Sequence, residues 1–351
     1  MGYGASSFKS EKRSKQYVNR AGLLLLILLT AATLGACVTT EKQQVATPAD
    51  SIARSNDFVV LTAKPGDTAA TLAAAYLGDQ RKSWIIEEYN SIKTVQPGQE
   101  VVIPLHFDRR GGLYKDGYQL VPVLVYHRFS DSCNDPLCVK TEVFEKQMRY
   151  LHENGYRTIT LRDFYEFSRF QKTIPKKAVI ISIDDGYSSV YDIAVPILRR
   201  YGFKATLFIY TDFVGNGKRA MDWEQLKELK NEGFDVESHT KSHADLTKKR
   251  PQETQAQYVA RINKELTVPR TLFKEHLGYE PDFLAYPYGR TNAQVSELAQ
   301  KAGYLAGFTV SGKSNPFFVT PYTVSRAQVY NATEINTFEQ RAKTLQEQDL
   351  L

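Results

Sequence analysis

Cysteine is scarce in this sequence: the 351 residues include three, and Cys133 and Cys138 are only five positions apart. No further pair of Cys or His stands near them at the spacing of a zinc finger, so a structural zinc site of that kind is not expected. A long apolar run is also missing. The run Ala21–Leu29 is much shorter than the roughly 20 residues that a membrane-spanning helix needs, so no convincing membrane span is predicted.

A strong charge of one sign is also missing once the first 36 residues are set aside. The whole chain carries a formal charge of +6, but residues 1–36 contain five basic residues and one acidic residue, a net +4. The remaining residues therefore carry a net +2. Because so small an excess attracts polyanions only weakly, nucleic-acid binding is not predicted.

Residues 1–36 have the order of a secretory signal peptide, with a basic leader, an apolar run and then small residues. Leu34–Cys37 reads Leu-Gly-Ala-Cys and resembles the lipobox of bacterial lipoproteins. The resemblance implies cleavage before Cys37 and acylation of that residue, which would hold the exported protein to a membrane. Val38 implies, by the same analogy, the outer membrane, facing the periplasm. An ordinary signal peptide with a chance cysteine is the alternative.

Export would place the other two cysteines in an oxidising compartment, and the segment after the signal peptide would follow the lipid anchor. In an oxidising periplasm, Cys133 and Cys138 are expected to form a disulfide that closes a small loop, with a free buried pair as the alternative. Residues 37–56 are rich in Thr, Ala, Gln and Ser, which predicts a flexible tether.

Residues 57–105 predict a small domain with the order strand, helix, helix, strand. Asp67 or Thr68 provides an N-cap for the first helix, and Pro-Gly pairs mark the turns. The expected elements are Phe58–Leu61, Ala69–Tyr76, Trp84–Asn90 and Glu100–Pro104.

This order resembles the LysM domain, which has Gly-Asp-Thr after its first strand, Asn at the end of its second helix and Pro-Gly-Gln before its last strand. The corresponding residues here are Gly66–Thr68, Asn90 and Pro97–Gln99. The resemblance implies binding of glycans that contain N-acetylglucosamine, such as peptidoglycan. A spacer that has kept the fold and lost the binding groove is the alternative.

Residues 106–119 are expected to link this module to a larger domain at 120–335, with a C-terminal tail at 336–351. In the larger domain strands alternate with helices, which predicts an α/β fold with a parallel sheet closed or nearly closed into a barrel. The expected strands are Val121–Tyr126, Thr158–Thr160, Ala178–Ile183, Ala205–Tyr210, Phe234–Glu237, Phe283–Tyr286, Leu305–Val310 and Thr323–Val329. The expected helices are Thr141–Asn154, Leu161–Phe170, Ser188–Tyr201, Trp223–Glu232, Gln252–His276 and Asn292–Ala302.

The residues with chemically useful side chains follow these strands. His127 follows the first strand, and Asp184 and Asp185 follow the third. His239 and the segment Tyr286–Tyr288 follow the fifth and sixth strands. Barrel enzymes gather their catalytic loops at the carboxyl ends of the strands. The sequence therefore predicts one active site at that face.

Two motifs at this face indicate a metal site. Adjacent carboxylates such as Asp184 and Asp185 repel each other, so a buried pair needs a cation or a shared proton. His239 and His243 are four residues apart, which brings both rings to one side of a helical or turn-like segment. One carboxylate and two imidazoles leave a position open for water, as a hydrolytic zinc site requires. Each motif alone is modest, because Asp-Asp-Gly is often a turn and His-x-x-x-His a solvated helix face.

With these motifs, residues from about Val121 to Val329 resemble the polysaccharide deacetylases of carbohydrate esterase family 4, the NodB-homology domain. That family has Asp-Asp-Gly, then His-Ser/Thr-x-x-His, then Pro-Tyr-Gly, and this chain has Asp184–Gly186, His239–His243 and Pro287–Gly289. The resemblance implies a distorted (β/α) barrel. It also implies metal-dependent removal of N-acetyl groups from a polysaccharide of the cell envelope or extracellular space that contains N-acetylglucosamine.

The resemblance assigns roles to single residues. Asp185, His239 and His243 are expected to bind a divalent metal, zinc foremost and cobalt or nickel as alternatives. Asp184 is expected to be the general base. The backbone N–H near Tyr288 is expected to stabilise the oxyanion together with the metal.

The sequence departs from the family pattern in two places. The Arg that orients the base before Pro-Tyr-Gly is replaced by Phe283–Ala285, so Arg290 and Arg326 are the candidates for that task. The late Leu-x-x-His motif that carries the general acid is absent, since no His follows His276. His127 resembles an early His of the branch that includes poly-N-acetylglucosamine deacetylases and is the expected acid, with a purely structural His as the alternative.

Four more residues are candidates for supporting roles. Asp222 is either an N-cap or a partner of a metal ligand. Tyr187, Trp223 and Tyr288 are expected to wall the sugar site, because apolar sugar faces stack on aromatic rings, and core packing is the alternative for each.

Two other functions remain open from the sequence. A metal-dependent amide hydrolase for small molecules is disfavoured by the LysM-like module, which suits a polymeric substrate. A catalytically inactive glycan-binding lipoprotein is disfavoured by the paired carboxylates and the open metal site.

Overall fold

A computed structural model describes residues 51–349. The expected signal peptide at 1–36, the lipidation site Cys37 and most of the expected tether lie outside the described residues. The last part of the tether range contains a strand, β1 (Ser51–Arg54), which pairs antiparallel with β2 (Phe58–Thr62). Between residues 51 and 349, no helix combines the length and the apolar character that crossing a bilayer requires.

The small domain contains the four expected elements in the expected order, β2, α1, α2 and β3, with β1 added at the sheet edge. Thr68 caps α1 by accepting a hydrogen bond from the Thr71 backbone N–H. The Asn90 side chain, at the end of α2, bonds the backbone N–H and C=O of Val102 in β3, which ties the second helix to the sheet. The bounds are α1 Ala69–Leu77, α2 Ser83–Asn90 and β3 Glu100–Pro104.

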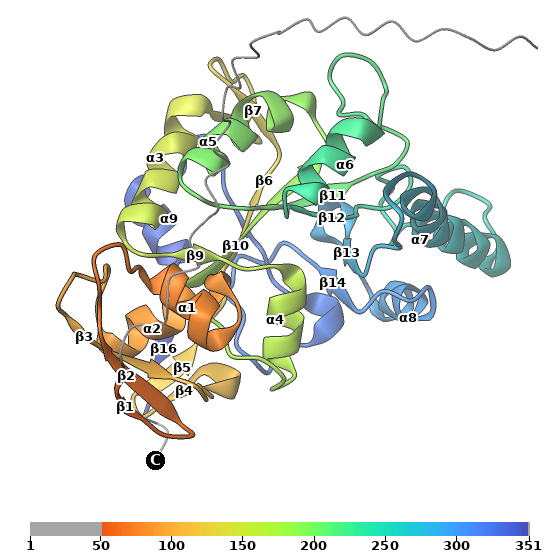
Figure 1. Ribbon diagram of the computed structural model, residues 1–351. Helices are drawn as coiled ribbons and strands as arrows, with labels where there is room; N and C mark the ends of the chain where they lie inside the picture. Colours follow the sequence, from red (N-terminus) through yellow and green to blue (C-terminus); the bar gives the residue numbers. More distant parts are fainter. Residues whose placement is uncertain (1–50, 350–351) are drawn as a thin grey trace, which may run out of the picture. The chain divides into compact units, whose positions relative to one another are not determined.

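The larger domain is built on parallel strands in the order β14-β13-β12-β11-β10-β6-β15, with β9 beside β10 (Figure 1). Val324, just before β15, forms a parallel bridge to Phe308 in β14, which brings the two edges of the sheet together. The expected distorted barrel is thereby confirmed. The bounds are β6 Val123–Tyr126, β9 Arg157–Thr158, β10 Ala178–Asp185, β11 Thr206–Ile209, β12 Asp235–Ser238, β13 Phe283–Ala285, β14 Ala306–Phe308 and β15 Ala327–Gln328.

Helices flank these strands. Strand β10 contributes side chains to two apolar cores, one between the sheet and the helices and one inside the barrel. Val179, Ile181 and Ile183 pack against the helices, whereas Ala178 and Ile180 point into the core inside the barrel. This is the alternation that a strand imposes on its side chains. The helices are α3 Thr141–Glu153, α4 Leu161–Ser168, α5 Val195–Arg200, α6 Trp223–Asn231, α7 Gln255–Leu277, α8 Ala293–Lys301 and α9 Ile335–Arg341.

The ranges expected to be linker and tail both contain strands. β4 (Leu113–Tyr114) and β5 (Gly117–Gln119) lie before the barrel, and β16 (Leu345–Glu347) follows α9 and pairs antiparallel with β5. Gly117 is required in this small sheet, because a Cβ at that position would collide with the backbone oxygen of Gln346. Strands of two or three residues show too little alternation to be recognised in a sequence.

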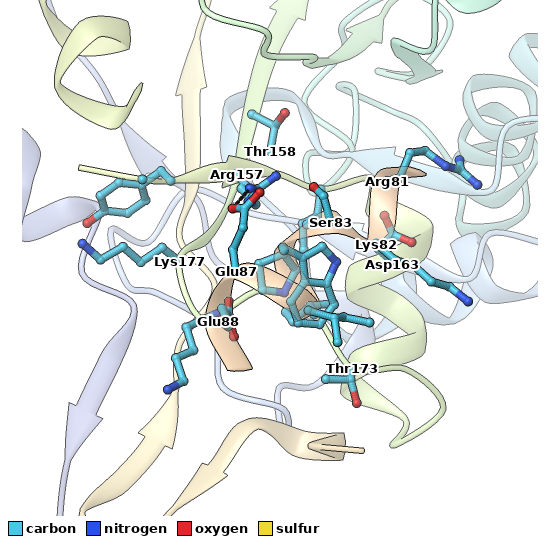
Figure 2. A pocket seen from close by; sticks show the side chains of 18 of the residues that line it. Arg81, Lys82, Ser83, Glu87, Glu88, Arg157, Thr158, Asp163, Thr173 and Lys177 are labelled. Carbon is cyan, nitrogen blue, oxygen red and sulfur yellow. Dashed lines mark hydrogen bonds and ion pairs between the residues drawn. The ribbon is translucent and has the colours of Figure 1, made fainter. Parts of the chain in front are cut away.

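A cavity of about 1730 Å³ lies between α2 and the amino-terminal ends of β9, β11 and β12 (Figure 2). Glu87 of α2 forms an ion pair with Arg157, and Glu88 forms one with Arg109. The Glu88 carboxylate also accepts a hydrogen bond from the Lys176 backbone N–H. These contacts attach the small domain at the strand ends that lie opposite to the expected active site.

Candidate active site

The expected metal ligands lie together at the carboxyl ends of β10 and β12. Asp185, His239 and His243 each offer one ligand atom, and these atoms all lie within 4.8 Å of one another. Asp185 Oδ1 is 3.7 Å from His239 Nε2 and 3.4 Å from His243 Nε2. Asp184 Oδ2 is 3.8 Å from the same nitrogen of His239. The four residues therefore share one cleft.

The backbone of Asp185 explains how two adjacent carboxylates reach this cleft. Neighbouring side chains of a regular strand point to opposite faces. Asp185 has φ 78, in the left-handed region, so the strand ends there and its side chain escapes the alternation. Thr240, His243 and Tyr288 also have positive φ. Conformations of this kind cost free energy in non-glycine residues and concentrate at functional sites.

A hydrogen bond fixes the orientation of the His239 imidazole. His239 Nδ1 lies 2.8 Å from the carbonyl oxygen of Ala285 and donates its proton there, which leaves the lone pair of Nε2 directed at Asp185. Burial lowers the pKa of His239 to about 3 and also lowers the pKa of His243. Both rings are therefore neutral at pH 7, which is the form that binds a metal.

A residue that the sequence analysis missed holds the loop between the two imidazoles. Glu265 of α7 is buried, and its carboxylate accepts hydrogen bonds from both the backbone N–H and the hydroxyl of Ser242. The Glu265 carbonyl oxygen accepts a third bond, from the Lys241 backbone N–H. The sequence shows Glu265 only as one of many polar residues in a long helix, so no local signal distinguishes it.

The donor set fits a cation. Asp185 Oδ1 is buried and has no hydrogen-bond partner. Burial and the charge of Asp184 raise the pKa of the Asp185 carboxyl to about 7. A buried carboxylate oxygen without a partner is costly unless a cation or proton meets it. One carboxylate and two neutral imidazoles are ligands that zinc prefers.

Arg326 orients the expected base. Its Nη1 and Nη2 donate hydrogen bonds of 2.6 and 2.8 Å to the two oxygens of Asp184, and its side chain is fully buried. Burial alone raises the pKa of Asp184, but the charge and hydrogen bonds of Arg326 and the charge of His239 outweigh it and lower the pKa to about 2. The other candidate, Arg290, pairs with Asp245 instead.

His127 lies at the end of β6, on the same face. Its Nδ1 is 3.4 Å from the side-chain nitrogen of Gln328, which follows Ala327 in β15. Burial lowers the pKa of His127 to about 4, against the opposing charge of Asp184. The imidazole is therefore neutral at pH 7 in the free protein.

The aromatic candidates take different places. The Tyr288 ring is 60% exposed and lies 4.8 Å from the His243 ring, and Tyr187 is half-buried two residues after Asp185. Trp223 stacks on His276 of α7 at 4.5 Å, which corresponds to the packing alternative. Asp222 forms a capping box with Gln225 at the start of α6, which corresponds to the N-cap alternative.

Comparisons with known proteins show which proteins this chain is similar to. Residues 171–307 match the family described as polysaccharide deacetylase. YxkH of Bacillus subtilis (strain 168), which is also named as a polysaccharide deacetylase, is 35% identical over 189 residues, 54% of this chain and 64% of that protein. The poly-beta-1,6-N-acetyl-D-glucosamine N-deacetylase of Staphylococcus aureus (strain MRSA252) is 28% identical over 197 residues, 53% of this chain and 68% of that protein.

A solved structure, IcaB from Ammonifex degensii, is similar with a TM-score of 0.55 at 27% identity, and the match covers 65% of this chain and 96% of that one. The matches to YxkH and to the staphylococcal deacetylase each span about two thirds of the length of that relative. The matched range 171–307 contains Asp184, Asp185, His239, His243 and the segment Pro287–Gly289. Over this range the chain is similar to polysaccharide deacetylases.

Proposed function

We propose that this protein removes N-acetyl groups from a cell-envelope or extracellular polysaccharide that contains N-acetylglucosamine, with a divalent metal, zinc foremost, as cofactor. One observation carries the proposal: Asp184, held ionised by Arg326, lies beside the three-ligand cluster of Asp185, His239 and His243. The names of the staphylococcal relative and of IcaB support an N-acetylglucosamine polymer as the substrate class.

The residues of the site have separate roles in the proposed hydrolysis. A metal bound by Asp185, His239 and His243 supplies a Lewis acid that polarises the acetamide carbonyl. Asp184 accepts a proton from the attacking water, and Arg326 keeps that carboxylate ionised and fixed in orientation. The amino group that leaves must gain a proton.

His127 is the residue that we assign to this proton transfer. It lies at the same strand ends, and the charge of Asp184 acts on its ring. Because the imidazole is neutral at rest, His127 takes up a proton from solvent in the substrate complex and then donates that proton to the leaving nitrogen, which returns it to the neutral form. The backbone N–H near Tyr288 is assigned to the oxyanion.

We also propose roles for Cys37 and for the small LysM-like domain. Cys37 is proposed to be acylated, so that the protein is anchored in the envelope, at the outer membrane facing the periplasm. The LysM-like domain is proposed to bind N-acetylglucosamine-containing glycan, including peptidoglycan. Both assignments rest on the sequence patterns described above.

The test is acetate release from acetylated chito-oligomers, β-1,6-linked poly-N-acetylglucosamine and peptidoglycan, before and after removal of metal by a chelator. Wild type is expected to release acetate from at least one glycan, to lose this activity with the chelator and to regain it with zinc. Asp184→Asn is expected to lower kcat at least 100-fold, and His127→Ala by about 100-fold. Release from no glycan by zinc-loaded protein would favour the inactive glycan-binding alternative, and release from small amides only would favour the small-molecule hydrolase.

A further inference from the structure

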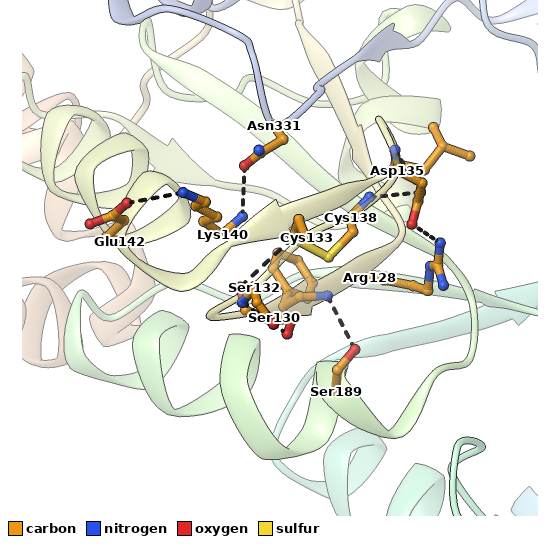
Figure 3. Close-up of a disulfide and its surroundings, with 12 residues drawn as sticks. Arg128, Ser130, Ser132, Cys133, Asp135, Cys138, Lys140, Glu142, Ser189 and Asn331 are labelled. Carbon is orange, nitrogen blue, oxygen red and sulfur yellow. Dashed lines mark hydrogen bonds and ion pairs between the residues drawn. A yellow bond between two sulfur atoms is a disulfide. The ribbon is translucent and has the colours of Figure 1, made fainter.

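A disulfide-closed loop stands next to the candidate active site. Cys133, in the segment that joins β7 (Arg128–Ser130) to β8 (Cys138–Lys140), forms a disulfide with Cys138 at the start of β8, and the two strands pair in parallel (Figure 3). β7 begins directly after His127, so the loop rises from the strand end that carries the proposed acid. Lys140 is tied to Asn331 by a hydrogen bond from its backbone N–H.

The loop presents one carboxylate to this strand end. Asp135 lies between the two cysteines, and its Oδ1 accepts hydrogen bonds from the backbone N–H groups of Leu137 and Cys138. Its other oxygen forms an ion pair with the Arg128 guanidinium, as Figure 3 shows. The disulfide therefore restrains the turn that holds the partner of Arg128.

Arg128 in turn contacts an aromatic ring beside the metal ligands. Its guanidinium carbon lies 5.3 Å from the centre of the Tyr187 ring, within the range of a cation–π contact. Tyr187 contacts Phe213 at 5.1 Å, and Phe213 stacks on Tyr210 at 5.2 Å. Tyr210 lies 5.3 Å from His243.

These contacts form a continuous row from the disulfide loop to a metal ligand. Tyr187 is half-buried, so part of its surface faces solvent. A half-exposed aromatic ring at this place suits the apolar face of a sugar.

We propose that the Cys133–Cys138 loop positions the substrate: through Asp135 it holds Arg128 against Tyr187, and the Tyr187 ring binds the sugar that carries the reacting acetamide. Arg128 is a positioning residue in this scheme, because it acts on the substrate only through the Tyr187 ring. The inference rests on the proposed deacetylase function. It follows that the oxidised protein binds the glycan more tightly than the reduced protein, with the same chemistry afterwards.

The test separates KM from kcat on the zinc-loaded full chain with an acetylated chito-oligomer. Cys133→Ser/Cys138→Ser and Asp135→Asn are expected to raise KM about five-fold, the size of a lost cation–π or aromatic contact, with kcat within two-fold. Tyr187→Ala is expected to raise KM at least as much, and Tyr187→Phe to retain the wild-type KM. A phosphine reductant is expected to raise the KM of wild type and to leave the double serine variant unchanged, which controls for effects of the reductant on zinc.

Asp131→Asn is the matched control, because it removes the same charge from the exposed start of the same loop and Asp131 does not pair with Arg128. Unchanged KM in the double serine and Asp135→Asn variants would overturn the inference, as would equal losses in kcat and thermal stability. The Kd for the unreacted oligomer, measured after each change is combined with Asp184→Asn, tests the same effect on binding independently of KM. No turnover by wild type on any glycan would instead overturn the proposed function, and the two failures are therefore distinguishable.

Discussion

At the scale of single residues, the pairing of Asp184 with Arg326 sets the protonation state of the proposed base. The two residues are 142 positions apart in the chain, and the sequence offered Arg326 only as one of two candidates. Burial without the guanidinium would raise the pKa of Asp184, because the charged form of a carboxyl is disfavoured in an apolar interior. In the family pattern an Arg before Pro-Tyr-Gly orients the base, and we assign this role to Arg326 here.

Replacing Arg326 by Met tests this role. Asp184 has a lowered pKa of about 2 in the folded protein, so its carboxyl is ionised at pH values well above 2. Loss of Arg326 raises the pKa, and we expect the acid limb of the pH–activity profile to move to higher pH, with kcat at pH 7 at least 100-fold lower. Arg290→Met is the control, since that residue pairs with Asp245. An unshifted acid limb in the Arg326→Met variant would show that another group keeps Asp184 ionised.

At the scale of elements, the regular parts of the fold could be predicted, whereas the irregular parts could not. The continuous apolar run of β10 indicated a strand buried on both faces. The expected helices occur within a few residues of their predicted ends, except that the first part of the helix expected at Ser188–Tyr201 is a π-helix, Val190–Ala194, and α5 begins only at Val195. The positive φ of Asp185 and the short strands β4, β5 and β16 could not be predicted. Their conformations depend on tertiary contacts, and a local pattern does not record these.

Helix α7 supplies a contact of this kind, and it can be tested. Glu265→Gln keeps the size of the side chain but places an amide where two donors of Ser242 now meet carboxylate oxygens. We expect the zinc Kd to increase by about ten-fold or more, because hydrogen bonds behind metal ligands orient them. Competition with a chromophoric chelator measures the Kd without reference to activity.

The control lies on the same helix. Glu275→Gln removes the same charge from an exposed position and is expected to leave the zinc Kd unchanged. A Glu265→Gln variant with lower thermal stability but an unaltered zinc Kd would mean that Glu265 supports the fold and has no influence on the metal ligands.

At the scale of the whole molecule, the small domain and the candidate site lie at opposite ends of the strands. The ion pair between Glu87 and Arg157 is at the amino-terminal end of β9, whereas His239 follows the carboxyl end of β12. Glycan bound by the small domain would therefore not be the sugar that reacts. The proposed task of the domain is to keep a polymer near the enzyme, which raises the local substrate concentration and leaves the chemistry unaffected.

If the small domain only holds the polymer, its loss is expected to slow the reaction on a polymer but not on short oligomers. A chain that lacks residues 51–105 is expected to deacetylate short soluble oligomers with a kcat/KM within about two-fold of wild type, but to be roughly ten-fold or more slower on an insoluble polymer. Glu87→Gln, which removes the ion pair to Arg157 and keeps the domain, is expected to match wild type on both substrates. Circular dichroism shows whether the barrel remains folded in each variant. If the shortened chain stays folded and loses activity equally on oligomer and polymer, the small domain must influence the active site through the strands that it contacts, and a role limited to glycan binding would be wrong.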